Sequence, residues 1–117
     1  MKKILVAEDN DSNFILMTYI LRKFYSYERA KNGKEAVDMV EDGAYDMVLM
    51  DIKMPIMDGL EATKAIKEKH PDLPIIALTA NAFDSDRQLA VQAGCSDFLA
   101  KPVSSDLCIK TIRKFLD

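Results

Sequence analysis

Cysteine and histidine are both scarce in this sequence. The two cysteines, Cys95 and Cys108, stand far apart and lack the spacing of a metal site, so we expect them to be reduced thiols. The single histidine, His70, precedes Pro71 at the end of an expected helix and has no cysteine or histidine neighbour. A surface position is expected for it, rather than a role as a metal ligand or a base.

Long apolar runs and dense clusters of one charge are also missing. No stretch is long enough to span a bilayer, and the apolar run after Lys2-Lys3 ends at Glu8, too early for a signal peptide. We therefore expect a cytoplasmic domain without membrane contact. The net charge is −3 and no group of lysines and arginines marks a groove-reading element, so direct binding to nucleic acid is not expected. No glycine-rich loop follows the first apolar run, which argues against nucleotide binding.

The 117 residues are enough for one domain, which we expect to cover residues 1–117. Strand patterns and helix patterns alternate along the chain. The expected strands cover residues 3–8, 27–30, 46–50, 74–78 and 97–100. The expected helices cover residues 11–25, 33–41, 60–70 and two later segments, one ending near Ala93 and one opening at Ser104 or Ser105. This alternation predicts an α/β fold, in which a parallel sheet of five strands carries five helices on its two faces.

Two details of the packing follow from the same patterns. Residues 27–30 carry Glu28 and Arg29 and lead into no functional residue, so this strand is expected at an edge of the sheet. The last helix is expected to bury Leu107, Ile112 and either Phe115 or Leu116.

Four short apolar runs each stop at a polar residue. These runs cover residues 4–7, 47–50, 75–78 and 98–100, and they stop at Glu8-Asp9, Asp51, Thr79 and Lys101 in turn. Runs without alternation suit strands that are buried on both faces of a parallel sheet. Because the ligand crevice of such a sheet lies at the carboxyl ends of its strands, three carboxylates, a hydroxyl and an ammonium should meet there.

These residue types fit a divalent cation and a phosphoryl group. Glu8, Asp9 and Asp51 would resist joint ionisation unless a cation neutralised them, and a hard ion such as Mg²⁺ prefers oxygen ligands. Asp51 can also act as a nucleophile that forms an acyl phosphate, with Lys101 and Thr79 to hold phosphate oxygens. The alternatives are a solvated acidic loop or helix-start cluster, a surface lysine and an ordinary strand threonine. The bond between Lys101 and the following proline can be trans, or cis and able to aim the ammonium into the crevice.

In this order the motifs resemble the receiver domain of two-component response regulators, over nearly the whole chain. The matching motifs are Glu8-Asp9-Asn10, Met50-Asp51-Ile52-Lys53-Met54-Pro55, Met57-Asp58-Gly59, Leu78-Thr79-Ala80-Asn81-Ala82 and Phe98-Leu99-Ala100-Lys101-Pro102. The resemblance implies a flavodoxin-like, doubly wound sheet of five parallel strands in the order 2-1-3-4-5, with the first and third strands side by side at the switch point. Residues 54–59 and 77–82 are most similar to receivers of hybrid sensor histidine kinases or phosphorelays.

By position, the resemblance implies that Asp51 takes a phosphoryl group from a phosphohistidine on a partner, a histidine kinase or a histidine phosphotransfer domain. It implies that Asp9, Asp51 and the backbone carbonyl of Lys53 ligate Mg²⁺. Glu8 would join them directly or through water, and it departs from the family pattern, in which Asp is more frequent here. Lys53 and Asn81 lie at positions that modulate dephosphorylation in similar proteins.

The resemblance also implies how the phosphoryl group is held and sensed. Lys101 would pair with one phosphoryl oxygen, and Thr79 and the Ala80 backbone amide would hold the others. Thr79 and Phe98 would switch the surface formed by the fourth helix, the fifth strand and the fifth helix. Phe98 replaces the frequent tyrosine of the family, so packing alone would hold its inward rotamer.

The alternative is an enzyme, a Mg²⁺-dependent phosphohydrolase that works through an aspartyl phosphate. The sequence has no cap domain or substrate-binding insertion, and Lys53 stands where a second aspartate would act as acid and base. A receiver-like module without phosphorylation is a third possibility, but it usually requires loss of a key residue and all are present. We therefore expect a signalling domain and no enzyme. Whether it is a stand-alone relay protein or a domain of a larger sensor stays open, as does its oligomeric state.

The first helix predicts a partner surface independently of the family. The buried stripe of this helix is expected to comprise Leu16, Met17, Ile20, Leu21 and Phe24. Phe14, Ile15 and Tyr19 are then left as an exposed apolar patch close to Asp51. Such patches often mark interfaces, so a histidine-bearing helical bundle is expected to dock there. Scattered surface hydrophobes, which are common, are the alternative.

Overall fold

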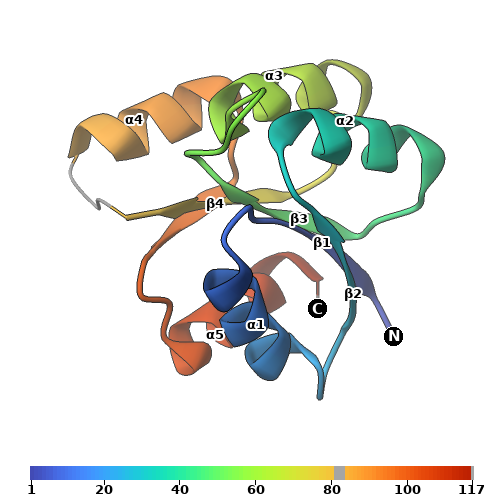
Figure 1. Cartoon of the computed structure of the whole chain (residues 1–117), viewed down its shortest axis with the longest axis vertical. Coiled ribbons are helices and arrows are strands. Elements are labelled where there is room, and N and C mark those ends of the chain that lie inside the picture. Colours follow the sequence, from blue (N-terminus) through green and yellow to red (C-terminus); the bar gives the residue numbers. More distant parts are fainter. Residues whose placement is uncertain (81–83, 117) are drawn as a thin grey trace.

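A five-stranded parallel sheet forms the centre of the computed structural model, which describes residues 1–80 and 84–116 (Figure 1). The strands are β1 (Lys3–Ala7), β2 (Ser26–Ala30), β3 (Met47–Asp51), β4 (Ile75–Thr79) and β5 (Asp97–Ala100). Their order is β2-β1-β3-β4-β5, and every neighbouring pair is parallel. The predicted strand order is therefore confirmed, with β2 at an edge.

Helices connect the strands and cover both faces of the sheet. They are α1 (Asp11–Leu21), α2 (Gly33–Asp42), α3 (Gly59–Lys69), α4 (Asp84–Ala93) and α5 (Ser105–Leu116). Figure 1 shows α1 and α5 on one face of the sheet, and α2, α3 and α4 on the other. Among the described residues, no helix combines the length and the apolar character that crossing a bilayer requires.

The side chains of the strands divide the core into two layers. In β1, Ile4 and Val6 pack with the buried residues of α1 and α5, while Leu5 and Ala7 pack with those of α2, α3 and α4. The strands β3 and β4 are buried along their whole length, which explains the unbroken apolar runs in the sequence. The edge strand β2 pairs with β1, and its side chains alternate in burial up to the buried Ala30.

Polar caps and a glycine set the ends of the helices. The Asn10 side chain accepts a hydrogen bond from the Asn13 N–H at 3.0 Å, just before α1. The Ser104 hydroxyl accepts one from the Leu107 N–H at 3.4 Å, so Ser104 is the residue that caps α5. Gly94 follows α4 with a φ of 110°, a conformation that favours glycine.

The prediction for α1 is wrong in two respects. The helix ends at Leu21, because the chain must leave it in time to enter β2 at Ser26. Phe24 therefore lies outside the helix and is 47% exposed, and Tyr25 is buried in the core instead. Leu16 lies at the flank of the buried stripe and is 41% exposed.

One prediction for α5 is also wrong. Leu107, expected in the core, is 54% exposed, and the neighbouring Cys108 is fully buried. Cys108, Ile112 and Leu116 follow one another at a spacing of four residues, so they share the face that packs on the sheet. Ile112 and Leu116 are thus confirmed as core residues, while Phe115 lies on the flank and is 38% exposed.

A polar network surrounds Tyr45 near the amino-terminal ends of β1 and β3. The Tyr45 hydroxyl donates a hydrogen bond to the Glu28 carboxylate of β2. The ammonium of Lys3 lies 3.3 Å from that carboxylate and 5.1 Å from the centre of the Tyr45 ring. Burial, followed by the hydrogen bond to Glu28 and its charge, raises the pKa of Tyr45 to about 12.

We expect the free energy of unfolding to fall less steeply at alkaline pH in Tyr45→Phe than in the native chain. The folded state binds the Tyr45 proton more tightly than the unfolded chain does, where the pKa is near 10.0. Its contribution to the free energy of unfolding is therefore complete below about pH 10 and is lost as the pH rises to about 12. Urea unfolding across this range should show a shallower pH dependence in the variant. Glu28→Gln, which keeps an acceptor without the charge, should give an intermediate slope, and equal slopes in all three proteins would contradict the assignment.

Candidate functional site

The predicted site residues meet at the carboxyl ends of four adjacent strands. Glu8 and Asp9 directly follow β1, Asp51 ends β3, Thr79 ends β4, and Lys101 directly follows β5. Because these four strands are neighbours in the sheet, residues that are distant in sequence come to one edge.

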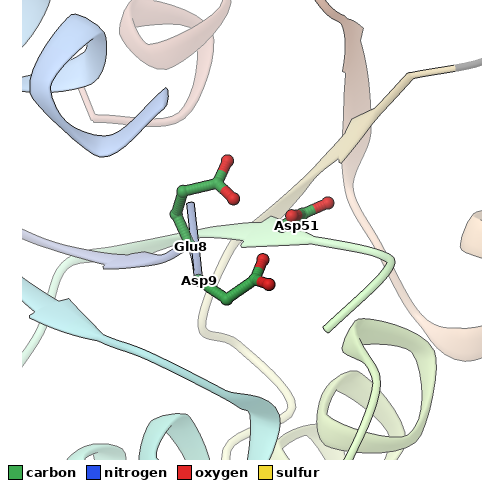
Figure 2. A group of neighbouring side chains, drawn as sticks. All are labelled: Glu8, Asp9 and Asp51. Atoms are coloured by element: carbon green, nitrogen blue, oxygen red, sulfur yellow. The ribbon is translucent and has the colours of Figure 1, made fainter. Parts of the chain in front are cut away.

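Three carboxylates form the acidic part of this edge. One carboxylate oxygen from each of Glu8, Asp9 and Asp51 lies within 4.8 Å of the others. Figure 2 shows the Glu8 and Asp9 side chains leaving the end of β1 on opposite sides, with both carboxylates near that of Asp51. Glu8 and Asp51 are buried, at 1% and 6% exposure, and Asp9 is exposed. A set of carboxylate oxygens that solvent reaches from one side suits a hard divalent cation.

The ammonium of Lys101 contacts two of these carboxylates. The Nζ atom of Lys101 lies 2.7 Å from Glu8 Oε1 and 3.2 Å from Asp51 Oδ2. The peptide bond between Lys101 and Pro102 is cis. Burial lowers the pKa of Lys101, but the hydrogen bond to Glu8 and the charges of Asp51 and Glu8 outweigh it, so the pKa lies above its ordinary value. Lys101 is therefore a firmly held positive charge beside Asp51.

Glu8 is the most deeply buried of the three acids. Its Oε2 atom accepts a hydrogen bond from the Asn10 N–H at 3.3 Å, and its Oε1 atom accepts one from Lys101. Burial, followed by the contact with Asp51, raises the pKa of Glu8, and the ammonium of Lys101 opposes this only in part. Among the described residues, the ammonium of Lys101 is the only cationic group paired with these three carboxylates, and this deficit of positive charge is what a bound cation would fill.

The remaining polar groups of the site lie around Asp51 and Thr79. Asp51 Oδ1 accepts a hydrogen bond from the Lys53 N–H at 3.3 Å, and the Lys53 side chain is exposed. Thr79 is buried, and its hydroxyl donates to Asp86 Oδ2 of α4 at 3.3 Å. Ala80 follows β4 and is exposed. Sequence reasoning missed Asp86, because nothing in its local pattern separates it from the other charged residues of α4.

Phe98, the predicted switch residue, is half-buried in β5. Its ring packs against the core layer of α2, α3 and α4. The guanidinium carbon of Arg87, from α4, lies 4.6 Å from the ring centre. A large movement of this ring would therefore change its contact with Arg87. Asn81, named with Lys53 as a modulating position, lies outside the described residues.

The exposed apolar patch on α1 differs by one residue from the predicted one. Ile15 and Tyr19 are exposed, at 52% and 59%, as expected. The expectation for Phe14 is wrong: it is half-buried, and its ring meets the Tyr27 ring edge to face with 6.1 Å between centres. Leu16, which was expected in the core, is exposed beside Ile15. We call Ile15, Leu16 and Tyr19 the α1 patch.

An open hollow of about 500 Å³ lies beside the acidic cluster. Its lining includes Asp9, Lys53 and Asp58 on one side and the α4 residues Asp86 and Leu89 on the other. A ligand or a side chain of another protein can therefore reach the exposed carboxylate of Asp9 from solvent.

Comparison with known proteins shows the family. The model of the response regulator receiver domain matches residues 4–113. Hybrid signal transduction histidine kinase B of Dictyostelium discoideum is 42% identical over 132 aligned positions, which cover 100% of this chain and 7% of that kinase. The chain thus spans a small part of the length of this relative.

Two solved structures are similar over nearly the whole chain. The receiver domain of the sensor histidine kinase PA1611 from Pseudomonas aeruginosa is 38% identical, with a TM-score of 0.91, and covers 97% of this chain and 96% of its own. That structure has a magnesium ion coordinated in its active-site cleft.

The second structure is the receiver domain of the response regulator Ssk1, crystallised with the histidine phosphotransfer protein Ypd1 of Saccharomyces cerevisiae. It is 33% identical, with a TM-score of 0.91, and covers 97% of this chain and 88% of its own. Receiver domains are signalling domains, and the PA1611 receiver is one that holds a magnesium ion in its active-site cleft. This chain has a similar fold, and in it Glu8, Asp9 and Asp51 form an acidic cluster at the carboxyl edge of the sheet. It therefore belongs to the response regulator receiver domain family of two-component signalling.

Proposed function

We propose that this receiver domain accepts a phosphoryl group on Asp51 from a phosphohistidine of a partner protein, with the help of Mg²⁺. The observation that carries the proposal is the position of the Asp51 carboxylate, beside two other carboxylates and the ammonium of Lys101. The partner would be a histidine kinase or a histidine phosphotransfer domain, the kind of protein with which the Ssk1 receiver was crystallised.

The transfer forms one bond and breaks another. An oxygen of Asp51 attacks the phosphorus atom and forms a P–O bond, while the P–N bond to the partner's histidine breaks and leaves its electron pair on the nitrogen. Such a reaction depends mainly on positioning and on neutralising the charge of the phosphoryl oxygens. Lys101 can pair with one of these oxygens, and the Thr79 hydroxyl and the Ala80 N–H can donate to others.

Glu8, Asp9, Asp51 and the Lys53 carbonyl would hold the Mg²⁺ ion, with Glu8 acting directly or through water. The bound ion would supply further positive charge to the phosphoryl oxygens. The excess of carboxylates over ammonium groups at the site supports this assignment.

Thr79 and Phe98 would communicate phosphorylation to the surface. The Thr79 hydroxyl donates to Asp86 of α4, so a phosphoryl oxygen on Asp51 would compete with Asp86 for this hydrogen bond. Phe98 lies against Arg87 of the same helix. A change between two arrangements of these residues would alter the surface of α4, β5 and α5, which makes the domain a switch or a relay rather than an enzyme with a free substrate.

Intact-mass measurement after incubation with Mg²⁺ and phosphoramidate tests the proposal. We expect the mass of one added phosphoryl group on the native chain. None should be added to Asp51→Asn, or to the native chain when a chelator removes the metal. Glu68→Gln, which changes an exposed carboxylate of α3, is the matched control and should be labelled normally. An unlabelled native chain, or normal labelling of Asp51→Asn, would overturn the proposal.

We assign the docking of the partner to the α1 patch. The helix α1 begins two residues after Asp9, so a protein seated on Ile15, Leu16 and Tyr19 would lie beside the acidic cluster. Neighbouring exposed apolar side chains often mark an interface. A helical bundle that carries the phosphohistidine fits this surface, because an apolar helix face can pack between the helices of a bundle.

Replacing Ile15 and Tyr19 by glutamate should slow transfer from phosphorylated Ypd1, used as the probe donor, by about tenfold or more. Labelling by phosphoramidate should stay unchanged, because the small donor needs no docking surface. Val91→Glu, which places the same charge on an exposed apolar position of α4, is the matched control and should leave both rates unchanged. Equal loss of both rates in the double variant would count against docking at the α1 patch.

A further inference from the structure

Arg29, on the edge strand β2, contacts the segment that carries two of the three carboxylates. Its side chain is largely buried, at 17% exposure. The Nε atom donates a hydrogen bond to the backbone carbonyl of Glu8 at 3.0 Å. The Nη1 atom lies 2.9 Å from Asp11 Oδ1, at the start of α1, and the guanidinium carbon lies 4.7 Å from the centre of the Phe14 ring. One side chain thus holds residues on both sides of Asp9.

The bond to the Glu8 carbonyl bears directly on Asp9. This carbonyl belongs to the peptide group that joins Glu8 to Asp9, and the plane of a peptide group is rigid. The Glu8 N–H is also held, by the Ala30 carbonyl at 2.9 Å. With both ends of Glu8 tied to β2, the direction in which the chain enters Asp9 is set, and so is the position of the Asp9 Cα atom from which its side chain leaves the backbone.

Asp9 has little else to hold it in place. Its side chain is exposed, and within residues 1–80 and 84–116 no hydrogen bond or ion pair of its own carboxylate is found. Glu8, by contrast, is fixed by Lys101 and by the Asn10 N–H. The closeness of Asp9 to the other two carboxylates therefore depends on the backbone at residues 8 and 9.

The placement of Arg29 also differs from that of an ordinary surface ion pair. Its Nη2 atom is buried and has no hydrogen-bond partner among the described residues. Leaving a buried donor unsatisfied is unfavourable, and a guanidinium paired with Asp11 alone could turn outward to solvent. The contacts with the Glu8 carbonyl and the Phe14 ring hold it inward instead.

From this geometry we infer that Arg29 is a positioning residue for the metal site: it orients the peptide group between Glu8 and Asp9 so that the Asp9 carboxylate faces Asp51. The inference rests on the proposed binding of Mg²⁺ at this cluster. Groups that orient metal ligands typically change metal affinity by about tenfold to a hundredfold when they are removed.

The sign of the effect separates positioning from simple electrostatics. Arg29 is a positive charge bonded to the segment that carries Glu8 and Asp9, so its charge alone disfavours a cation at the cluster, and removing it should strengthen Mg²⁺ binding. If Arg29 positions Asp9, removing it should weaken Mg²⁺ binding. Calorimetric titration with Mg²⁺ should therefore show a dissociation constant about tenfold or more higher in Arg29→Met than in the native chain.

Two further variants complete the experiment. Arg29→Lys keeps the positive charge but has a single side-chain nitrogen in place of the planar guanidinium. Weaker Mg²⁺ binding by this variant therefore reports on geometry alone. The same variant tests the inference if Arg29→Met fails to fold. Arg22→Met removes an exposed arginine that lies 4.6 Å from the Tyr19 ring without touching the acidic segment, and it should bind Mg²⁺ like the native chain. In NMR spectra of the metal-free protein, the Glu8 and Asp9 amide signals should shift in both Arg29 variants and stay in place in Arg22→Met.

The outcomes distinguish this inference from the proposed function. Native or tighter Mg²⁺ binding by both Arg29 variants, beside a native chain that binds the ion, would overturn the role of Arg29 and leave the metal site standing. A native chain that binds no Mg²⁺ would overturn both. Weaker binding in both Arg29 variants, with an unchanged Arg22→Met, is the result we expect.

Discussion

Lys101→Met should lower the free energy of unfolding by about 3 kcal/mol in the absence of metal, and Mg²⁺ should restore most of the loss. The ammonium of Lys101 contacts both Glu8 and Asp51, and all three side chains are largely buried. Without it, two buried carboxylates face each other with no cation between them, which is the costly way to break a buried ion pair. Urea unfolding with a chelator and with Mg²⁺ would measure both effects.

The gain in stability on adding Mg²⁺ should be larger in Lys101→Met than in the native chain. In the native chain the ion has to share the carboxylates with an ammonium that is already in place, whereas in the variant it meets them unpaired. A ligand present at about a hundred times its dissociation constant stabilises by about 2.7 kcal/mol, which is enough to offset most of the loss.

Lys34→Met is the matched control for this prediction. Lys34 pairs with Asp38 at 3.0 Å, but both side chains are more than half exposed, so the loss of this pair should cost less than about 1 kcal/mol and should not respond to Mg²⁺. A Lys101→Met protein as stable as the native chain without metal would contradict the view that Lys101 neutralises the site. An equal gain from Mg²⁺ in both proteins would do the same.

The parallel sheet and the acidic cluster at its carboxyl edge could be predicted because one physical pattern determines both, whereas the strand order was predicted from the resemblance to the receiver family. A strand buried on both faces has no polar position along its length, so the first polar residue after it marks the edge of the sheet. Asp51 and Lys101 stand 50 positions apart in the sequence, yet their side chains lie 3.2 Å apart because their strands end at the same edge. The motifs around these positions then identified the family.

The faces of α1 could not be predicted in the same way. The helix is apolar at most of its positions, so several stripes compete for the sheet and the periodicity does not decide between them. The choice depends on residues from elsewhere in the chain. Phe14 is half-buried because it packs between Tyr27 and the guanidinium of Arg29, both from β2, and Leu16 is left exposed.

The role of Arg29 at the site could not be predicted from the sequence either. Its strand leads into no functional residue, which in the sequence reads only as the sign of an edge. Its contacts with the Glu8 carbonyl and with Asp11 join segments about 20 residues apart, and the contact with Glu8 is to a backbone atom. Neither residue types nor spacing in the sequence could therefore predict these contacts. Asp86, the acceptor for the Thr79 hydroxyl, could not be predicted either, because nothing in its local pattern separates it from the other charged residues of α4.

Gly59→Ala should be strongly destabilising, although alanine is the better residue in a helix. Gly59 is the first residue of α3, and its N–H donates to the Ile52 carbonyl at 2.7 Å. A Cβ atom built there would lie 2.1 Å from the carbonyl oxygen of Asp51 and 2.8 Å from the Ile52 Cα. Both are backbone atoms, so either α3 or the end of β3 has to move. Such overpacking should lower the free energy of unfolding by about 3 kcal/mol, which thermal or urea unfolding would measure.

The same substitution should also slow labelling by phosphoramidate, because the displaced backbone is that of the phosphoryl acceptor itself. Gly43→Ala is the matched control, since Gly43 is exposed at the end of α2 and its nearest contact is the Tyr45 ring, a side chain that can shift. That variant should change stability by less than about 1 kcal/mol and leave labelling intact. If Gly59→Ala instead gained stability, as helix propensity alone predicts, the close approach of α3 to Asp51 could not be what holds the acceptor in place. A Gly59→Ala protein that lost stability but kept native labelling would place the strain in α3 and leave Asp51 where it is.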